Sequence, residues 1–395
     1  MTQEAGGGVH ERGAGRPRGR ALGLPFVGAS GPHNAITDVP GVEVGYHTCG
    51  AAAGIRTGVT VIFPCGKAAP GMSVWAGQFS FNGNGEMTGT HWIRDGGHFT
   101  GPIAITNSHS VGMVHHELVR WMVARVPEMQ AHHHWYLPVV AETYDGAAND
   151  INGLHVRPEH VQAALESARA GPVAEGNVGG GAGMMCYEFK GGSGTASRVV
   201  RIEGQDYTLG VFIQTNFGDR QDLQLFGVPV GRLWPEDAPF SSRGQGETGS
   251  AIIVVATDAP LHPIQLQRLA RRSAYGMART GTTGGVNSGD IMIAFTTANR
   301  RKWNSADRIH GSGIKTLTYL EDNLTDGLNR ATVQACEEAI VNALLAAEDV
   351  ALIKPAGAHL RAMDTGRLLG LLRDYRTLPA DGTNPYPRNE SDCKP

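Results

Sequence analysis

One stretch decides how the chain is organised: it reads Arg243-Gly-Gln-Gly-Glu-Thr-Gly-Ser-Ala-Ile-Ile-Val-Val-Ala-Thr-Asp258. Glycine, serine and charged residues form a loop as far as Gly249, and an apolar, largely β-branched run then covers residues 251–256. Such a run, bounded by turn residues, predicts a buried strand. Ser250 is therefore the last polar side chain before the core, at a rigid strand end that can hold a reactive group in place.

The junction between Gly249 and Ser250 also has a chemical property. It places a hydroxyl next to an unhindered carbonyl, which is the arrangement needed for an N-to-O acyl shift and self-cleavage. Cleavage would make Ser250 a new N-terminus, whose own amine can act as the base for its hydroxyl. From these residues alone, an ordinary turn before a strand is the better explanation of Gly-Ser.

The composition limits the class of protein. The 395 residues could form one large domain or about two or three ordinary ones. A hydrophobic content of 41% with 55 Gly indicates a globular chain with many tight turns. The formal net charge of -3, without a basic block in the body, argues against nucleic acid as a partner. No apolar run approaches the length of a membrane span, so we expect no membrane partner.

The cysteines and the N-terminal residues indicate where the protein resides. Five cysteines are scattered without a C-x-x-C pair, which indicates reduced thiols and favours the cytoplasm. Four arginines lie among Gly and Ala in the first 23 residues, which lack the apolar core of an export signal. We therefore expect a disordered tail over residues 1–23 and a fold that begins at Leu24.

Strand and helix patterns alternate loosely along the chain, which favours layers of sheet and helix. Residues 36–46 are predicted as strand, turn and strand. Further strands are predicted at 58–64, 72–81, 102–106, 136–143, 199–202, 207–215, 251–257 and 291–297. Helices are predicted at 110–126, 158–170, 263–279, 328–348 and 364–375.

Several familiar site patterns are incomplete. His116-Glu117 begins a zinc-protease motif, but Arg120 stands where the second histidine is needed. The glycines of residues 179–183 fail the dinucleotide fingerprint, so we interpret them as a close-packed turn. Adjacent histidines at 132–134 point to different sides, and no serine lies in Gly-x-Ser-x-Gly. We expect no metal and no cofactor.

What remains is a set of polar side chains at the ends of predicted strands. Strand ends are places where a sandwich or barrel presents side chains to a cleft. Taken singly, each is better explained as a turn residue that satisfies local backbone groups. The set consists of Glu142, Tyr144, Asn216, Ser250, Ser288 and Asp290.

Together these residues resemble a known family, the self-processing L-aminopeptidase/D-amidase-esterases and β-aminopeptidases, which are serine hydrolases. The resemblance extends from Asn34 to about Tyr375. Several separate motifs in the right order are far more specific than any one of them. The motifs lie at 34–45, 106–112, 142–146 and 214–218, at the Gly249-Ser250 junction, and at 287–290.

The resemblance implies an α+β fold, a four-layer αββα sandwich similar to the N-terminal-nucleophile hydrolases but with its own connectivity. It implies one catalytic domain over residues 24–395, cleaved into an α chain of 1–249 and a β chain of 250–395. Scaled by length from 41.9 kDa, these chains would be about 26 and 16 kDa. It also implies a homo-oligomer of αβ units.

The resemblance further implies a role for each strand-end residue. Ser250 is the nucleophile, its freed amine assists as base, and Ser288 and Asp290 hydrogen-bond near that amine and hydroxyl. Some family members place Glu where this chain has Asp290, one methylene longer. The remaining roles are an oxyanion-hole donor for Asn216, a position near the reacting oxygen for Tyr144, and pairing with the substrate's free amine for Glu142.

The expected function is an autoproteolytically activated serine aminopeptidase or amidase. It would release N-terminal L-, D- or β-amino residues from short peptides, amides and esters. One alternative is a self-cleaving acyltransferase that passes the acyl group to an amine acceptor. The non-enzymatic alternative is a binding or scaffold protein that keeps the fold with an uncleaved loop.

Overall fold

The apolar run after Ser250 forms the strand β11 (Thr248–Thr257) inside a six-stranded sheet. This computed structural model describes residues 16–50, 54–131, 134–240, 248–302, 314 and 316–375. β11 pairs parallel with β12 and antiparallel with β10. The sheet order is β4 (His98–Thr100), β3 (Met72–Ser80), β12 (Asn287–Lys302), β11, β10 (Gln205–Asn216) and β9 (Gly192–Ile202).

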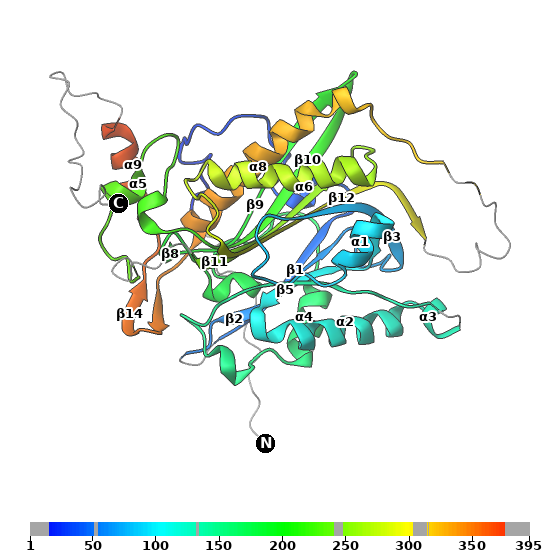
Figure 1. Ribbon diagram of the computed structural model, residues 1–395, viewed down its shortest axis with the longest axis horizontal. Coiled ribbons are helices and arrows are strands. Elements are labelled where there is room, and N and C mark those ends of the chain that lie inside the picture. The colour runs from blue at the N-terminus through cyan, green and yellow to red at the C-terminus, as the bar shows by residue number, and fades with distance from the viewer. Residues whose placement is uncertain are drawn as a thin grey trace.

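A second, four-stranded sheet lies against the first (Figure 1). Its order is β1 (Glu43–Cys49), β2 (Thr57–Phe63), β5 (Ile103–Asn107) and β6 (Val139–Thr143). Apolar side chains of both sheets meet between them, among them Ile62, Ile105, Ile252 and Ile293. All seven residues of β2 are buried because the strand is covered on both faces, which explains its unbroken apolar pattern.

Helices cover the outer face of each sheet. The helices α6 (Pro263–Ala278) and α8 (Asp326–Ala346) pack on the six-stranded sheet, while α2 (Val111–Arg125) and α4 (Pro158–Ser167) pack on the four-stranded one (Figure 1). The layers therefore run helix, sheet, sheet, helix, which confirms the predicted αββα sandwich. No helix in the described part of the chain has the length and apolar character to cross a membrane.

Shorter elements complete the fold. The helices are α1 (Thr90–Gly96), α3 (Glu128–Ala131), α5 (Val230–Leu233) and α9 (Thr365–Asp374). Two small hairpins join β7 (Met185–Cys186) to β8 (Phe189–Lys190) and β13 (Val350–Ile353) to β14 (Ala356–Leu360). Short 3-10 turns occupy Ile36–Asp38, Ser108–Ser110, Ile151–Gly153, Gly179–Gly183, Arg220–Asp222 and Asp322–Leu324.

The prediction of a strand at the start of 36–46 is wrong. Residues Ile36–Asp38 form a 3-10 turn, and the strand begins only at Glu43. The Asp38 carboxylate accepts hydrogen bonds from the backbone N–H groups of His33 (2.9 Å) and Ala35 (3.1 Å). These bonds fold the segment back on itself, as Asp side chains do in turns.

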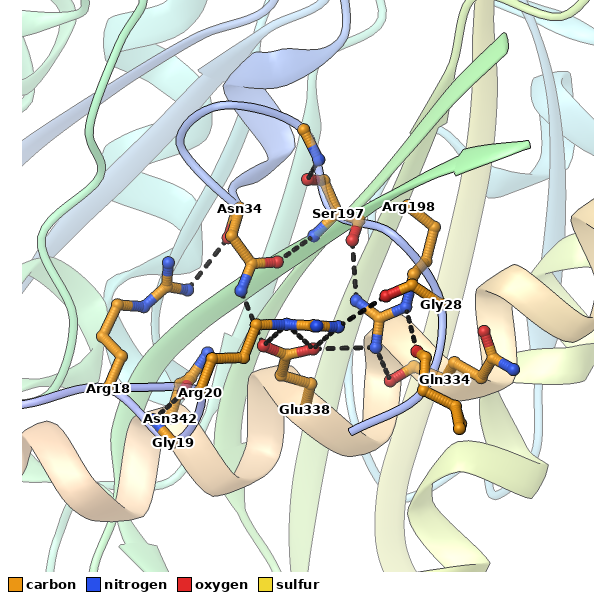
Figure 2. Close-up of polar contacts among 12 residues, drawn as sticks. Arg18, Gly19, Arg20, Gly28, Asn34, Ser197, Arg198, Gln334, Glu338 and Asn342 are labelled. Atoms are coloured by element: carbon orange, nitrogen blue, oxygen red, sulfur yellow. Dashed lines mark hydrogen bonds and ion pairs between the residues drawn. The ribbon is translucent and has the colours of Figure 1, made fainter. Parts of the chain in front are cut away.

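The segment before β1 is held against α8 by buried charges (Figure 2). The fully buried Glu338 carboxylate of α8 accepts hydrogen bonds from Arg20 Nε (2.8 Å) and Asn34 Nδ2 (2.6 Å). It also pairs with Arg198 at 2.7 Å, and Arg18 pairs with Glu175 at 2.7 Å. The predicted disordered tail is therefore wrong for residues 16–23, while residues 1–15 lie outside the described part.

Candidate active site

Alternation along β11 fixes the direction of each side chain. Ile252 and Val254 pack between the two sheets, whereas Ala251 and Ile253 pack toward the outer helices. Because successive side chains of a strand point to opposite faces, Ser250 points to the inter-sheet side. Ser250 lines a cavity of about 1090 Å³, although the residue is only 3% exposed.

The backbone at the Gly249-Ser250 junction is tightly enclosed. Gly249 pairs with Ser288 and Ser250 with Gly289, so the strand runs through the junction without a break. A Cβ on residue 249 would lie 2.2 Å from the backbone oxygen of Asn216, which only glycine avoids. The Ser250 Oγ has no hydrogen-bond partner in the described part of the chain. The hydroxyl is thus buried and uncommitted, and the residue before it is a glycine, whose carbonyl carries no neighbouring side chain.

Asn216 lies directly opposite Ser250 in the β10–β11 ladder and also lines the cavity. Its Oδ1 accepts a hydrogen bond from the backbone N–H of Met185 at 3.1 Å. Because a backbone N–H can only donate, this bond fixes the orientation of the amide. The Nδ2 group is then left to donate, and among the described residues no acceptor engages it. A preorganised donor of this kind can stabilise an oxyanion.

Glu142 provides a buried negative charge in the same cavity. It stands near the end of β6 and is 6% exposed. Its Oε1 accepts from the Glu86 backbone N–H at 2.9 Å, and its Oε2 accepts from the Ser108 hydroxyl. Burial raises the pKa of Glu142 in spite of these two bonds. A bound ammonium group would offset the cost of keeping this carboxylate charged.

Tyr144 lies on the wall of the cavity and is half exposed. Its hydroxyl lies over Gly146, where a Cβ would come within 2.2 Å of the phenol oxygen. Gly146 therefore makes room for the ring. Within the described residues the Tyr144 hydroxyl has no hydrogen-bond partner, so it is free to contact a bound molecule.

Ser288 and Asp290 are close to Ser250 but do not line the cavity. Both are fully buried, and they flank Gly289, the residue paired with Ser250. The Ser288 hydroxyl donates to Asp290 Oδ1 at 2.8 Å, and Asn82 Nδ2 donates to Oδ2 at 3.0 Å. Burial raises the pKa of Asp290, against the effect of hydrogen bonds that include the Ala251 backbone. The pair thus lies beside the Ser250 backbone, and no described hydrogen bond joins it to the Ser250 hydroxyl.

Comparison with known proteins identifies the family of this chain. The model of peptidase family S58 matches residues 34–356. The chain belongs to peptidase family S58. It is 46% identical over 383 residues to the beta-peptidyl aminopeptidase BapA of Sphingosinicella microcystinivorans, covering 92% of this chain and 94% of that protein.

Solved structures of similar proteins agree with the fold. The L-aminopeptidase D-Ala-esterase/amidase of Ochrobactrum anthropi, described as a variant of the Ntn hydrolase fold, superposes with a TM-score of 0.84. The two share 48% identity over 91% of this chain and 99% of that one. A Burkholderia sp. beta-aminopeptidase gives a TM-score of 0.82 at 43% identity over 92% and 100% of the two chains. This S58 peptidase is thus a hydrolase of the serine aminopeptidase type, as the resemblance implied.

Three supporting residues of this S58 site had no predicted role. Asn82 directly follows the strand predicted at 72–81, and its Nδ2 donates a hydrogen bond to Asp290. Ser108 lies inside a motif that carried the resemblance, and its hydroxyl bonds to Glu142. Met185 acts through its backbone N–H, so its side-chain type contains no signal for this function.

Among the described residues, one cluster of metal-ligating residue types lies outside the cavity. His47, Cys49 and His160 each place a ligand atom within 4.8 Å of the others. The two imidazole rings stack at 4.6 Å with 7° between their planes, and Nδ1 of His160 accepts the Arg157 backbone N–H. Parallel rings cannot direct their in-plane lone pairs at one point, so the cluster does not form a prepared tetrahedral site. His132 and His133 lie outside the described residues.

Proposed function

We propose that this S58 peptidase activates itself by cleavage between Gly249 and Ser250 and then releases N-terminal residues through an acyl-enzyme on Ser250. The observation that carries the proposal is the convergence of three groups on one cavity. They are an unpartnered buried hydroxyl (Ser250), an amide with a fixed orientation and a free N–H (Asn216), and a buried carboxylate (Glu142).

Activation begins with attack of Ser250 Oγ on the carbonyl carbon of Gly249. The Gly249–Ser250 C–N bond breaks, and the proton from Oγ passes to the Ser250 nitrogen, which leaves an ester. Water hydrolyses the ester to a Gly249 carboxyl group and a Ser250 with free amine and hydroxyl. Two features support this step: the hydroxyl has no competing partner in the described chain, and the carbonyl belongs to glycine.

Turnover then uses both groups of Ser250. Its free amine accepts the proton from Oγ as the oxygen attacks the substrate carbonyl, and Asn216 Nδ2 donates to the resulting oxyanion. The protonated amine of Ser250 gives the proton to the leaving group, and water hydrolyses the acyl ester. A free α-amine has a pKa near 8 in model compounds, so it is a usable base at about neutral pH. The position of Asp290 beside the Ser250 backbone suits it to orient this amine.

Glu142 explains a preference for substrates with a free N-terminus. An ammonium group paired with this carboxylate positions the first residue, whereas a blocked N-terminus leaves the buried charge unpaired. Relatives are named for β-peptidyl substrates and for L-aminopeptidase and D-Ala-esterase/amidase activity. We accordingly propose short peptides, amides and esters of L-, D- or β-amino residues as substrates.

A panel of p-nitroanilides tests the proposal. L-alanine, D-alanine and β-alanine p-nitroanilides are assayed beside their N-acetylated counterparts, with Ser250→Ala as the inactive control. We expect the wild type to hydrolyse at least one free-amine substrate and to act far more slowly on its acetylated form. Hydrolysis of both forms at equal rates, or activity that survives Ser250→Ala, would contradict the proposal.

A further inference from the structure

We propose that Arg232 and Lys354 form a subsite for the C-terminal carboxylate of the substrate. The cavity would then select short peptides with a free C-terminus over the corresponding C-terminal amides. This inference rests on the proposed aminopeptidase function and specifies its substrate class.

The two cations are exposed on the cavity wall and uncommitted. Both residues line the cavity and are exposed, and neither side chain makes a hydrogen bond or ion pair within the described part of the chain. Arg220, a third cation on the wall, differs from them. It is 2% exposed and donates to the backbone oxygens of Tyr187, Trp234, Glu236 and Glu188. Arg220 therefore links backbone segments of the cavity wall by hydrogen bonds, whereas the side chains of Arg232 and Lys354 are available to a ligand.

Both cations stand on backbone that is anchored to the wall. Arg232 lies on α5, which packs so closely on the preceding turn that a Cβ at Gly231 would lie 1.6 Å from the Arg220 oxygen. Lys354 occupies the turn between β13 and β14. Its N–H and that of Ile353 donate to the oxygen of Ala147 at 3.1 and 2.9 Å, and Ala147 itself lines the cavity. Because the backbone at both positions is anchored, the two cationic side chains start from defined positions on the cavity wall.

In the described part of the chain no ion pair joins Arg232 or Lys354 to an acidic residue that lines the cavity, and these acidic residues are Glu86, Glu142, Glu188 and Asp219. Both oxygens of Glu188 accept backbone N–H groups, from Arg220 at 3.4 Å and from Phe240 at 2.7 Å. Burial raises the pKa of Asp219, which lines the cavity, and the pKa of Asp222, which does not. The positive charge of Arg232 acts in the other direction on the pKa of Asp222. No ion pair joins Arg232 to either of these aspartates in the described residues.

The charges of the cavity therefore match a peptide zwitterion. Glu142 is buried in the cavity that Ser250 also lines and suits an ammonium group, while Arg232 and Lys354 offer exposed cationic donors elsewhere on the wall. Arg and Lys to carboxylate bonds are charge-assisted and stronger than neutral ones, but exposure weakens them. We expect each cation to contribute about three- to tenfold to kcat/KM for a substrate with a free carboxylate.

The test compares each dipeptide acid with its own amide, using alanyl-leucine and alanyl-leucinamide with L-alanine, D-alanine and β-alanine at the N-terminus. The variants are Arg232→Gln, Lys354→Met and the double variant. The control is Arg201→Gln, an exposed arginine on the β9–β10 hairpin that pairs with Asp206 and does not line the cavity. The measured quantity is the acid-to-amide ratio of kcat/KM within each variant, so losses of folding or processing cancel.

We expect the wild type and Arg201→Gln to favour the acids, and each cavity variant to lower the ratio by about three- to tenfold. The double variant should lower it further, and added salt should lower it in the wild type. A wild type that does not discriminate, or a double variant with an unchanged ratio, would overturn the subsite while leaving the aminopeptidase intact. Absence of hydrolysis of every acid and amide would overturn the proposed function and the subsite together.

Discussion

Asn216 and Ser250 are direct partners across the antiparallel β10–β11 ladder, so a side-chain amide stands beside the hydroxyl of the third residue of β11. The Met185 backbone N–H binds the amide oxygen and leaves the amide N–H of this cavity-lining residue free to donate. Rigid strands place both residues, which suits a donor that must be oriented before charge develops in the transition state.

Replacing Asn216 tests this donor. Asn216→Ala should lower kcat by roughly 10²–10³, because an oxyanion-hole donor is lost. Asn216→Asp should lower it comparably, since a carboxylate still accepts the Met185 N–H but donates nothing. The assay is steady-state hydrolysis of the best p-nitroanilide, normalised to the cleaved fraction on a denaturing gel. A kcat within threefold of wild type in both variants would remove Asn216 from this role.

Replacing Gly249 tests whether the tight packing at the junction is needed for self-cleavage. Gly249→Ala should block or strongly slow self-cleavage, because its Cβ would lie 2.2 Å from the Asn216 oxygen. Gly112→Ala is the matched control, because no atom lies within 4 Å of a Cβ at that position. A time course on a denaturing gel measures the single chain that remains. Cleavage of Gly249→Ala at the wild-type rate would show that the close approach does not constrain the reaction.

Glu142 should impose an acid limb on the pH dependence of kcat/KM. Ammonium binding requires the ionised carboxylate, which exists above its pKa, and burial raises that pKa. Activity should therefore fall as the pH decreases through a midpoint above the ordinary range of Glu. Ser108→Ala should move the limb to still higher pH, because it removes a bond that favours the carboxylate. The Ser250 amine, whose pKa lies near 8 in model compounds, imposes an acid limb of its own, so the wild type should lose activity with a limiting slope of about two protons. Glu142→Gln should lower kcat/KM and leave only the limb of the amine, with a slope of about one. An unchanged slope in this variant would contradict the role of Glu142.

The buried charges around Glu338 should contribute strongly to stability. Glu338→Gln leaves Arg198 and Arg20 without their counter-charge, and breaking a buried pair in this way costs about 3–5 kcal/mol. Urea denaturation measures the free energy of unfolding, with both proteins carrying Ser250→Ala so that each unfolds as one chain. Glu203→Gln, at an exposed turn, should change it by less than about 0.5 kcal/mol. Equal stability of the two variants would contradict this account of the N-terminal segment.

Local patterns of sequence are sufficient for much of this fold. A strand is predicted from the apolar run after Ser250, and helices are predicted from the apolar faces of residues 110–126 and 263–279. These patterns depend only on neighbours in sequence, and the structure confirms all three elements. The short turn at Ile36–Asp38 differs because one carboxylate, that of Asp38, captures two backbone groups. Contacts such as Arg20 with Glu338, 318 residues apart, have no local signal at all.

The site divides in the same way. The positions of Glu142, Asn216 and Ser250 at strand ends could be predicted, and the structure brings all three to one cavity. Sequence alone could not show that Ser288 and Asp290 lie beside the Ser250 backbone and outside the cavity lining, because this depends on the register of β12 against β11. The orientation of Asn216 depends on a backbone group of a distant hairpin, which no side-chain pattern reports.

The most direct test of the central claim is the intact mass of the purified, active protein under denaturing conditions, measured beside Ser250→Ala. We predict that the wild type separates into two chains of about 26 and 16 kDa, the smaller beginning with Ser250, by scaling 41.9 kDa to chain length. Ser250→Ala should remain a single chain of 41.9 kDa. An active wild type that consists only of the intact chain, or a Ser250→Ala variant that still yields both fragments, would contradict activation by self-cleavage at this bond.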